Sequence, residues 1–272
     1  MTDDQLRALT VRYGVRFDEC SPTGTLRAAA YLRYAQDVAW IHSERLGYDR
    51  DWYTRRGIAW LVRGVELELL EPVRTGQELD LTTRVIGFRR IWARRRTDVR
   101  TVDGRFVARA LTDWVLTDRQ GQPTRIPPEF PARFGLPAAP FSPLRVALPA
   151  QPPDALEVRF GVRYQELDPM GHANNAVYLE WIDELVRAWA GPGPSRPDAP
   201  DPTASFPRRY RLEYLAPVGP GSRLVATAWA DGGSVAWRLS EEAGVEISRA
   251  RLEPGSTDRP SPTPAQVTDP TA

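Results

Sequence analysis

Hydrophobic and polar residues alternate with a period of two along several short stretches of the chain. The clearest series are Val11, Tyr13, Val15 and Phe17, and later Val158, Phe160, Val162 and Tyr164. This alternation is typical of strands that bury one face. Similar patterns at residues 79–85 and 224–228 predict further antiparallel strands.

A different spacing follows each of the two clear series. Apolar residues recur at i, i+1, i+4, i+5, i+8 and i+9 in residues 30–39 and again in residues 177–186. Such residues form one broad stripe on a helix. A stripe this wide and this aromatic favours a long helix packed against a sheet.

The two series belong to an internal repeat. The segment Gly14–Gly24 matches the segment that begins 147 residues later at Gly161, and weaker matches continue downstream with slightly smaller offsets. Each copy therefore predicts a strand, a turn, one long helix and several more strands. The fold class that we expect is α+β, with a central helix in each half covered by a curled antiparallel sheet.

Proline-rich segments divide the chain. We expect an N-terminal domain at residues 1–137, an extended linker at 138–155 and a C-terminal domain at 156–253. Residues 254–272 have no aromatic residue and one bulky aliphatic residue, so this tail is expected to be disordered.

Composition excludes several classes of protein. The 36 basic residues, all arginine, nearly balance 35 acidic ones, which argues against a nucleic-acid-binding protein. One cysteine and two histidines argue against disulfides and against a metal centre. We also expect no organic cofactor. No signal peptide or membrane-spanning run is evident, which predicts a soluble cytoplasmic protein.

The turn before the second helix carries the strongest candidate chemistry. Asp168 lies at the turn, where its carboxylate could act as a general base or as a nucleophile. Gly171, Asn174 and Asn175 are candidate substrate-binding residues, because unpaired backbone amides at a helix start suit a developing negative charge. Either asparagine is a candidate N-cap. His172 is the second candidate catalytic residue, since it could orient Asp168 or donate to a substrate.

The first copy lacks these groups. Ser21 occupies the position of Asp168, Thr25 that of His172, and Arg27-Ala28 that of the two asparagines. We therefore expect one active site, in the second copy, with the first copy contributing partner surface and a substrate pocket.

Other polar residues have simpler interpretations. Asp168 could merely form a turn, and His42 is expected to be a packed helix residue. Asp183 and Glu184 on the second helix remain minor catalytic candidates. A run of arginines could dock an acidic partner protein, although we favour a solubilising role for it. Its members are Arg89, Arg90, Arg94, Arg95, Arg96 and Arg100.

Several motifs resemble those of acyl-acyl-carrier-protein thioesterases of the double hotdog type. They are Gln36–Gly47, Trp60–Arg63, Pro72–Gly76, Thr112–Asp118, Arg125–Glu129 and, in the second copy, Asp168–Tyr178. The last is similar to the hotdog thioesterase motif of an aspartate, a histidine and paired asparagines. The resemblance implies a tandem double hotdog fold. Met170 and Pro217 depart from it, standing where plant members carry an asparagine and an acidic residue.

This resemblance implies a thioester hydrolase that releases a free fatty acid from acyl carrier protein. An acyl-CoA thioesterase and a non-catalytic acyl-thioester binding module are the alternatives, and a hotdog dehydratase fits the motif less well. The thioester substrate is the expected partner, without nucleic acid. The two halves are expected to pair as a pseudo-dimer within one monomer, or within a homodimer.

Overall fold

The computed structural model describes residues 7–135, 141–190 and 203–255. The first half contains β1 (Leu9–Gly14), η1 (Phe17–Glu19), α2 (Ala28–Arg45), α3 (Arg50–Arg56), β2 (Ile58–Leu69), β3 (Glu78–Arg89), β4 (Trp92–Thr101), β5 (Phe106–Asp118) and α4 (Glu129–Arg133). The second contains β6 (Leu156–Gly161), η2 (Tyr164–Glu166), α5 (Val177–Ala190), β7 (Arg208–Tyr214), β8 (Arg223–Asp231), β9 (Ser234–Glu241) and β10 (Glu246–Pro254).

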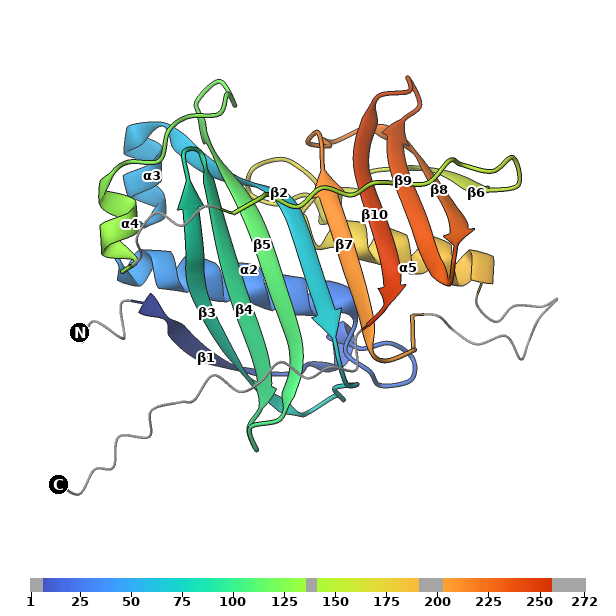
Figure 1. Ribbon diagram of the computed structural model, residues 1–272, viewed down its shortest axis with the longest axis horizontal. Helices are drawn as coiled ribbons and strands as arrows, with labels where there is room; N and C mark the ends of the chain where they lie inside the picture. The colour runs from blue at the N-terminus through green and yellow to red at the C-terminus, as the bar shows by residue number, and fades with distance from the viewer. Residues whose placement is uncertain (1–6, 136–140, 191–202, 256–272) are drawn as a thin grey trace.

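All ten strands belong to one antiparallel sheet, in the order β1-β3-β4-β5-β2-β7-β10-β9-β8-β6. β2 and β7 join the halves edge to edge, with Val65 opposite Leu212. The helices α2 and α5 both lie behind the sheet in Figure 1, end to end across its concave side. The predicted α+β class, with a long helix on an antiparallel sheet in each half, is confirmed.

The core lies between the two helices and the sheet. One continuous cluster of buried residues runs through both halves and includes Leu32 and Val38 of α2, Ile182 of α5, and Leu81 and Leu212 of the sheet. Full burial of each large aliphatic side chain contributes about 1.5–3 kcal/mol. The buried stripes of α2 and α5 therefore stabilise the packing of both helices against the sheet.

Two short helices were not expected from the repeat. α3 begins after Asp49, whose side chain accepts a hydrogen bond from the backbone amide of Trp52, and it ends at Gly57 in a left-handed conformation. α4 places Phe130 and Phe134 in a second cluster with Tyr48 and Phe88. These helices cover the end of the first half that is far from α5 (Figure 1).

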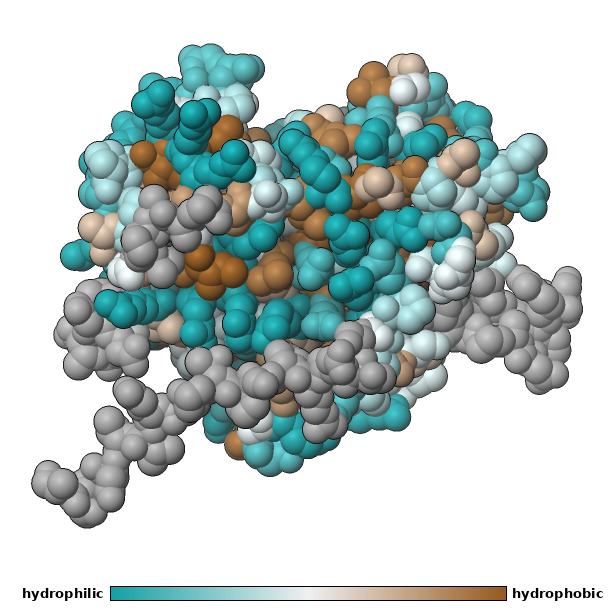
Figure 2. Space-filling model, in the orientation of Figure 1, coloured by the Kyte–Doolittle hydropathy of each residue, from teal (hydrophilic) through white to brown (hydrophobic). Residues whose placement is uncertain are grey.

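The segment between the halves crosses the outer face of the sheet, opposite the helices (Figure 1). Its residues 141–150 form neither helix nor strand. Two buried carboxylates fix it, because Asp113 accepts from the amide of Leu144 and Glu213 from the amide of Val146. Figure 2 shows this face covered mostly by hydrophilic residues, with hydrophobic ones between them.

The expected domain limits stay predictions. Residues 136–140, which contain the first limit, lie outside the described part, as do residues 256–272 of the expected disordered tail. None of the helices in the described ranges combines the length and hydrophobicity that crossing a bilayer requires.

Candidate active site

A buried glutamate organises the turn that precedes α5. Glu166, 4% exposed, accepts hydrogen bonds from the amide and guanidinium of Arg163 and from the indole N–H of Trp181. Burial opposes the charged form, but these donors outweigh it and lower the pKa of Glu166. Glu166 was not among the predicted site residues, although a glutamate stands at the same position in both copies of the repeat.

Asp168 is half-buried on this turn. Its Oδ1 accepts from the backbone amide of Met170 at 2.8 Å, and its own amide donates to the carbonyl of His172. Oδ2 has no hydrogen-bond partner among the described residues. The carboxylate is therefore held by one oxygen and leaves the other available. Its charge adds to burial in raising the pKa of Tyr178, on the first turn of α5.

The expected row of unpaired backbone amides is only partly present. Gly171 donates to Asp168, Ala173 to the carbonyl of Val218, and Asn174 to that of Glu166. These bonds close the turn, so the prediction was wrong for the amides of Gly171 and Asn174. In the described structure the amides of His172 and Asn175 make no hydrogen bond, and they are the remaining candidate donors to an oxyanion.

The other predicted residues surround Asp168. The His172 ring is half-buried and forms no hydrogen bond with any described residue, so the structure does not bond it to Asp168. Asn174 accepts through Oδ1 from the amide of Ala176 and thus caps the helix start. The carbonyl of Asn175 accepts from the Tyr214 hydroxyl, whereas its side-chain amide has no partner within the described ranges.

The corresponding turn of the first half has the same backbone hydrogen bonds. Ser21 donates to Thr25, Gly24 to Ser21, Leu26 to Val73 and Arg27 to Glu19. Each donor and acceptor lies 147 residues before its counterpart in the second turn, apart from Val73, whose counterpart Val218 follows at 145. The two turns therefore share one backbone framework, but the second has Asp168 and His172 where the first has Ser21 and Thr25.

Two minor candidates and the departures from the family motif can also be placed. Asp183 accepts from the hydroxyl of Tyr210 at 2.6 Å, beneath the sheet, and Glu184 is exposed. Met170 and Pro217 are both exposed, and Pro217 adjoins Val218, which binds the turn. Neither side chain supplies a polar group to Asp168, although the backbone amide of Met170 donates to its Oδ1.

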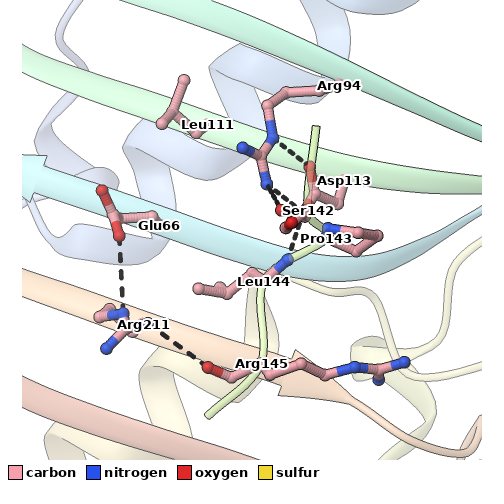
Figure 3. A pocket seen from close by; sticks show the side chains of 9 residues that line it. All are labelled: Glu66, Arg94, Leu111, Asp113, Ser142, Pro143, Leu144, Arg145 and Arg211. Carbon is pink, nitrogen blue, oxygen red and sulfur yellow. Dashed lines mark hydrogen bonds and ion pairs between the residues drawn. The ribbon is translucent and has the colours of Figure 1, made fainter. Parts of the chain in front are cut away.

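A pocket of about 270 Å³ lies on the outer face of the sheet, beneath residues 142–145. Figure 3 shows Arg94 and Arg211 projecting into it, with α2 behind the sheet. Arg94 donates through Nε and Nη2 to the two carboxylate oxygens of Asp113, at 2.6 and 2.7 Å. Nε of Arg211 lies 3.6 Å from Oε2 of Glu66. This pocket is thus separated from Asp168 by the sheet, and its arginines are paired with carboxylates.

Members of the arginine run lie on both faces of the sheet. Arg94 and Arg96 lie on the outer face, paired with Asp113 and Asp98, and a solubilising role for them stays a prediction. Arg95 instead points inward and is buried against His42. His42 is 1% exposed, as a packed helix histidine should be. No cluster of three potential metal ligands occurs among the described residues.

The sheet and helix arrangement matches that of known structures. An acyl-ACP thioesterase from Bacteroides thetaiotaomicron has 16% identity and a TM-score of 0.76, over 93% of this chain and 99% of that one. A putative oleoyl thioesterase from Lactobacillus plantarum has 17% identity and a TM-score of 0.76, over 92% and 97%. The 12:0-ACP thioesterase from Umbellularia californica has 21% identity and a TM-score of 0.73, over 90% and 96%. At these identities the similarity shows the fold, and it confirms the tandem hotdog arrangement.

Sequence comparison shows the family. No relative matches among curated proteins. The family models for the acyl-ACP thioesterase N-terminal domain and C-terminal domain match residues 7–134 and 150–190, together more than half of the chain. The chain therefore belongs to the acyl-ACP thioesterase family and is a thioester hydrolase.

Proposed function

We propose that this enzyme hydrolyses fatty acyl-acyl carrier protein to a free fatty acid, with Asp168 at the reacting bond. The observation that carries this assignment is the pair of turns with one backbone framework, of which only the second bears Asp168 and His172. A difference confined to side chains on equivalent frameworks supports a chemical role for those side chains, because the fold needs neither of them.

The chemistry requires water, a base or nucleophile, and donors to the carbonyl oxygen. Oδ2 of Asp168 either removes a proton from water or attacks the thioester carbon itself. The C–S bond then breaks, the thiolate takes a proton, and water supplies the hydroxyl of the released acid. The amides of His172 and Asn175, with the Asn175 side chain, are the proposed donors to the oxyanion, and the His172 ring is the proposed proton donor to the sulfur.

The first half supplies the proposed acyl slot. At each buried position where the helix stripes differ, α2 has the smaller residue. Ala30, Ala35, Val38, Ala39 and His42 stand where α5 has Val177, Ile182, Leu185, Val186 and Trp189. The smaller buried residues of α2 support placing the acyl chain along this helix.

Thiol release from acyl carrier protein thioesters tests the catalytic assignment. The Asp168→Asn variant is expected to lose at least about 10³-fold in kcat, because the amide can neither take a proton nor attack. The matched control is Ser21→Asn in the sister turn, which should retain full activity. Equal turnover of Asp168→Asn and wild type would remove Asp168 from the mechanism.

The choice of carrier is tested separately. Rates on acyl chains of matched length, attached to acyl carrier protein or to CoA, are expected to favour the protein-linked thioester. The alternative, an acyl-CoA thioesterase, would be assigned if the CoA thioester had the higher kcat/KM.

A further inference from the structure

The inner face of the first half carries polar side chains where a hydrophobic core is expected. Thr83 of β3, Arg95 and Thr97 of β4, and Thr112 of β5 are all buried on the face that packs on α2. We call these four residues the inner polar patch. Arg95 Nη1 lies 2.9 Å from Nδ1 of His42 and 3.3 Å from the Thr83 hydroxyl, and Thr97 donates to Thr83 at 3.1 Å.

Within the described part of the chain, Arg95 has no anionic partner. It is 8% exposed, and no carboxylate of the described residues forms an ion pair with it. Burial lowers the pKa of Arg95 to about 10, which reflects the cost of holding this charge away from water. The indole N–H of Trp114, two residues from Thr112 on the same face, is also buried without a partner. Among the described residues the patch therefore has several donors but no anionic acceptor, because Arg95 forms hydrogen bonds only with the neutral groups of Thr83 and His42.

The second half shows that the fold does not require this patch. The strand registers place Ala228, Val235, Trp237 and Leu252 at the positions of Thr83, Arg95, Thr97 and Thr112. All four are apolar and buried. The same sheet position thus packs well with hydrocarbon alone, so a buried guanidinium in the first half needs another reason.

The patch lies in line with the proposed acyl slot. Arg33 of α2 pairs with Glu180 of α5 at 2.8 Å, so the two helices meet near the turn that carries Asp168. His42 lies nine residues beyond Arg33, about 14 Å along the helix at 1.5 Å per residue. Ala35 and Ala39 lie on the buried stripe between these points. In Figure 1, α2 runs away from α5 towards α3 and α4.

We propose that the inner polar patch binds a carboxylate at the far end of the acyl chain, so that the preferred substrate is the thioester of a dicarboxylic acid. The inference rests on the proposed function for the placement of the chain. Arg95 supplies the charge and a planar set of donors, the fit of guanidinium to carboxylate, and Thr112 and Trp114 lie within the same face as further donors. A methyl-ended chain would leave the guanidinium buried without an anion.

Binding of free acids provides a test that does not depend on catalysis. Calorimetry with the full chain, over a series of matched monocarboxylic and dicarboxylic acids, is expected to show about 10–100-fold tighter binding of the dicarboxylic acid at its best length. The Arg95→Met variant should lose this preference, and Arg95→Lys should keep part of it. Equal affinity of wild type for the two acids, or an unchanged preference in Arg95→Met, would overturn the proposal.

Hydrolysis separates this inference from the proposed function. The kcat/KM of wild type on carboxylate-ended thioesters should exceed that on methyl-ended ones by a similar factor, and Arg95→Met should reverse the order. Arg249→Met, which removes an outer-face arginine paired with Glu246, is the matched control and should leave the ratio unchanged. Hydrolysis of methyl-ended thioesters alone would support the proposed function and refute this inference.

Thermal unfolding distinguishes a binding role of Arg95 from a purely structural one. Replacing a buried unpaired charge by methionine is expected to leave Tm unchanged or raise it. A lower Tm in Arg95→Met, with the acid preference retained in Arg95→Lys and Arg95→Met alike, would assign Arg95 a structural role instead.

Discussion

The turns at residues 16–27 and 163–174 form a natural comparison within one molecule. Both hold a short 3₁₀ helix, a glycine with positive φ and a glutamate that binds the preceding arginine. They differ in the side chains at two matching positions, Ser21 and Thr25 against Asp168 and His172. The fold and the chemistry of the turn are thus carried by different residues.

The helices that follow the two turns differ in the size of their buried residues. α5, next to Asp168, has large buried residues, whereas α2 has alanines at the matching positions. The half that carries the reacting group has the larger buried helix residues, and the other half has the smaller ones. This division suggests that one half positions the thioester and the other accommodates the chain, and three sets of variants test it.

The largest expected effect in these tests comes from removing the glutamates beneath the turns. Glu166→Ala leaves the Arg163 guanidinium and the Trp181 indole without an acceptor, and should lower the free energy of unfolding by about 3 kcal/mol. Glu19→Ala is the matched control, because Glu19 binds Arg16 and Tyr34 in the same way. Denaturant unfolding should show losses in both variants, while thiol release measured on the folded fraction should fall only in Glu166→Ala.

Acid unfolding sharpens the same test. The pKa of Glu166 is lower in the folded protein than its ordinary value of 4.5, so its contribution to stability is complete above that value. The contribution is lost as the pH falls below about 4.5 through the folded pKa, because protonation removes the charge that Arg163 binds. Glu166→Gln should therefore flatten the pH dependence of stability below 4.5. An unchanged slope there would show that other carboxylates dominate acid unfolding.

An intermediate effect is expected from making α2 resemble α5. The double variant Ala35→Ile and Ala39→Val should lower kcat/KM for long acyl chains about tenfold, close to 1.4 kcal/mol in the barrier, while short chains retain their rate. Leu185→Ile in α5 is a control of conserved volume. A uniform loss for all chain lengths together with a lower Tm would indicate overpacking of an already filled core.

The smallest effect concerns the contact between the helices. Arg33 and Glu180 are partly exposed, with side chains 43% and 36% accessible. Arg33→Ala should therefore change the free energy of unfolding by about 0.5 kcal/mol or less at moderate salt. A loss above 2 kcal/mol would show that the end-to-end arrangement of the helices depends on this ion pair rather than on the shared sheet.

Much of this architecture could be predicted from the sequence because the chain contains an internal repeat whose two copies can be compared. The offset between Gly14 and Gly161 aligned strands, turns and helix stripes, and alternation identified their buried faces. The pairing of Val65 with Leu212, which makes one sheet of two, was not accessible, because periodicity does not specify which edges meet. The helix α3 had a readable signature in Asp49 and Gly57, but its few apolar residues gave no stripe.

The candidate site was predicted less completely than the fold. The position of Asp168 followed from the repeat, whereas the state of each amide depended on hydrogen bonds to residues such as Val218, distant in the chain. Arg95 was treated as one of a charged run. Strand alternation separates it from Arg94 and Arg96, but its burial depends on α2 and α4 closing over that end of the sheet.

The covalent joining of the halves has a further consequence. In a symmetric homodimer every substitution occurs twice, so an alanine that opens space beside one helix would also loosen the helix next to the reacting group. Here β2 and β7 bring two independently encoded halves into one sheet. Mutation can therefore retune chain selectivity in one half without disturbing bond cleavage in the other, a freedom that identical subunits lack.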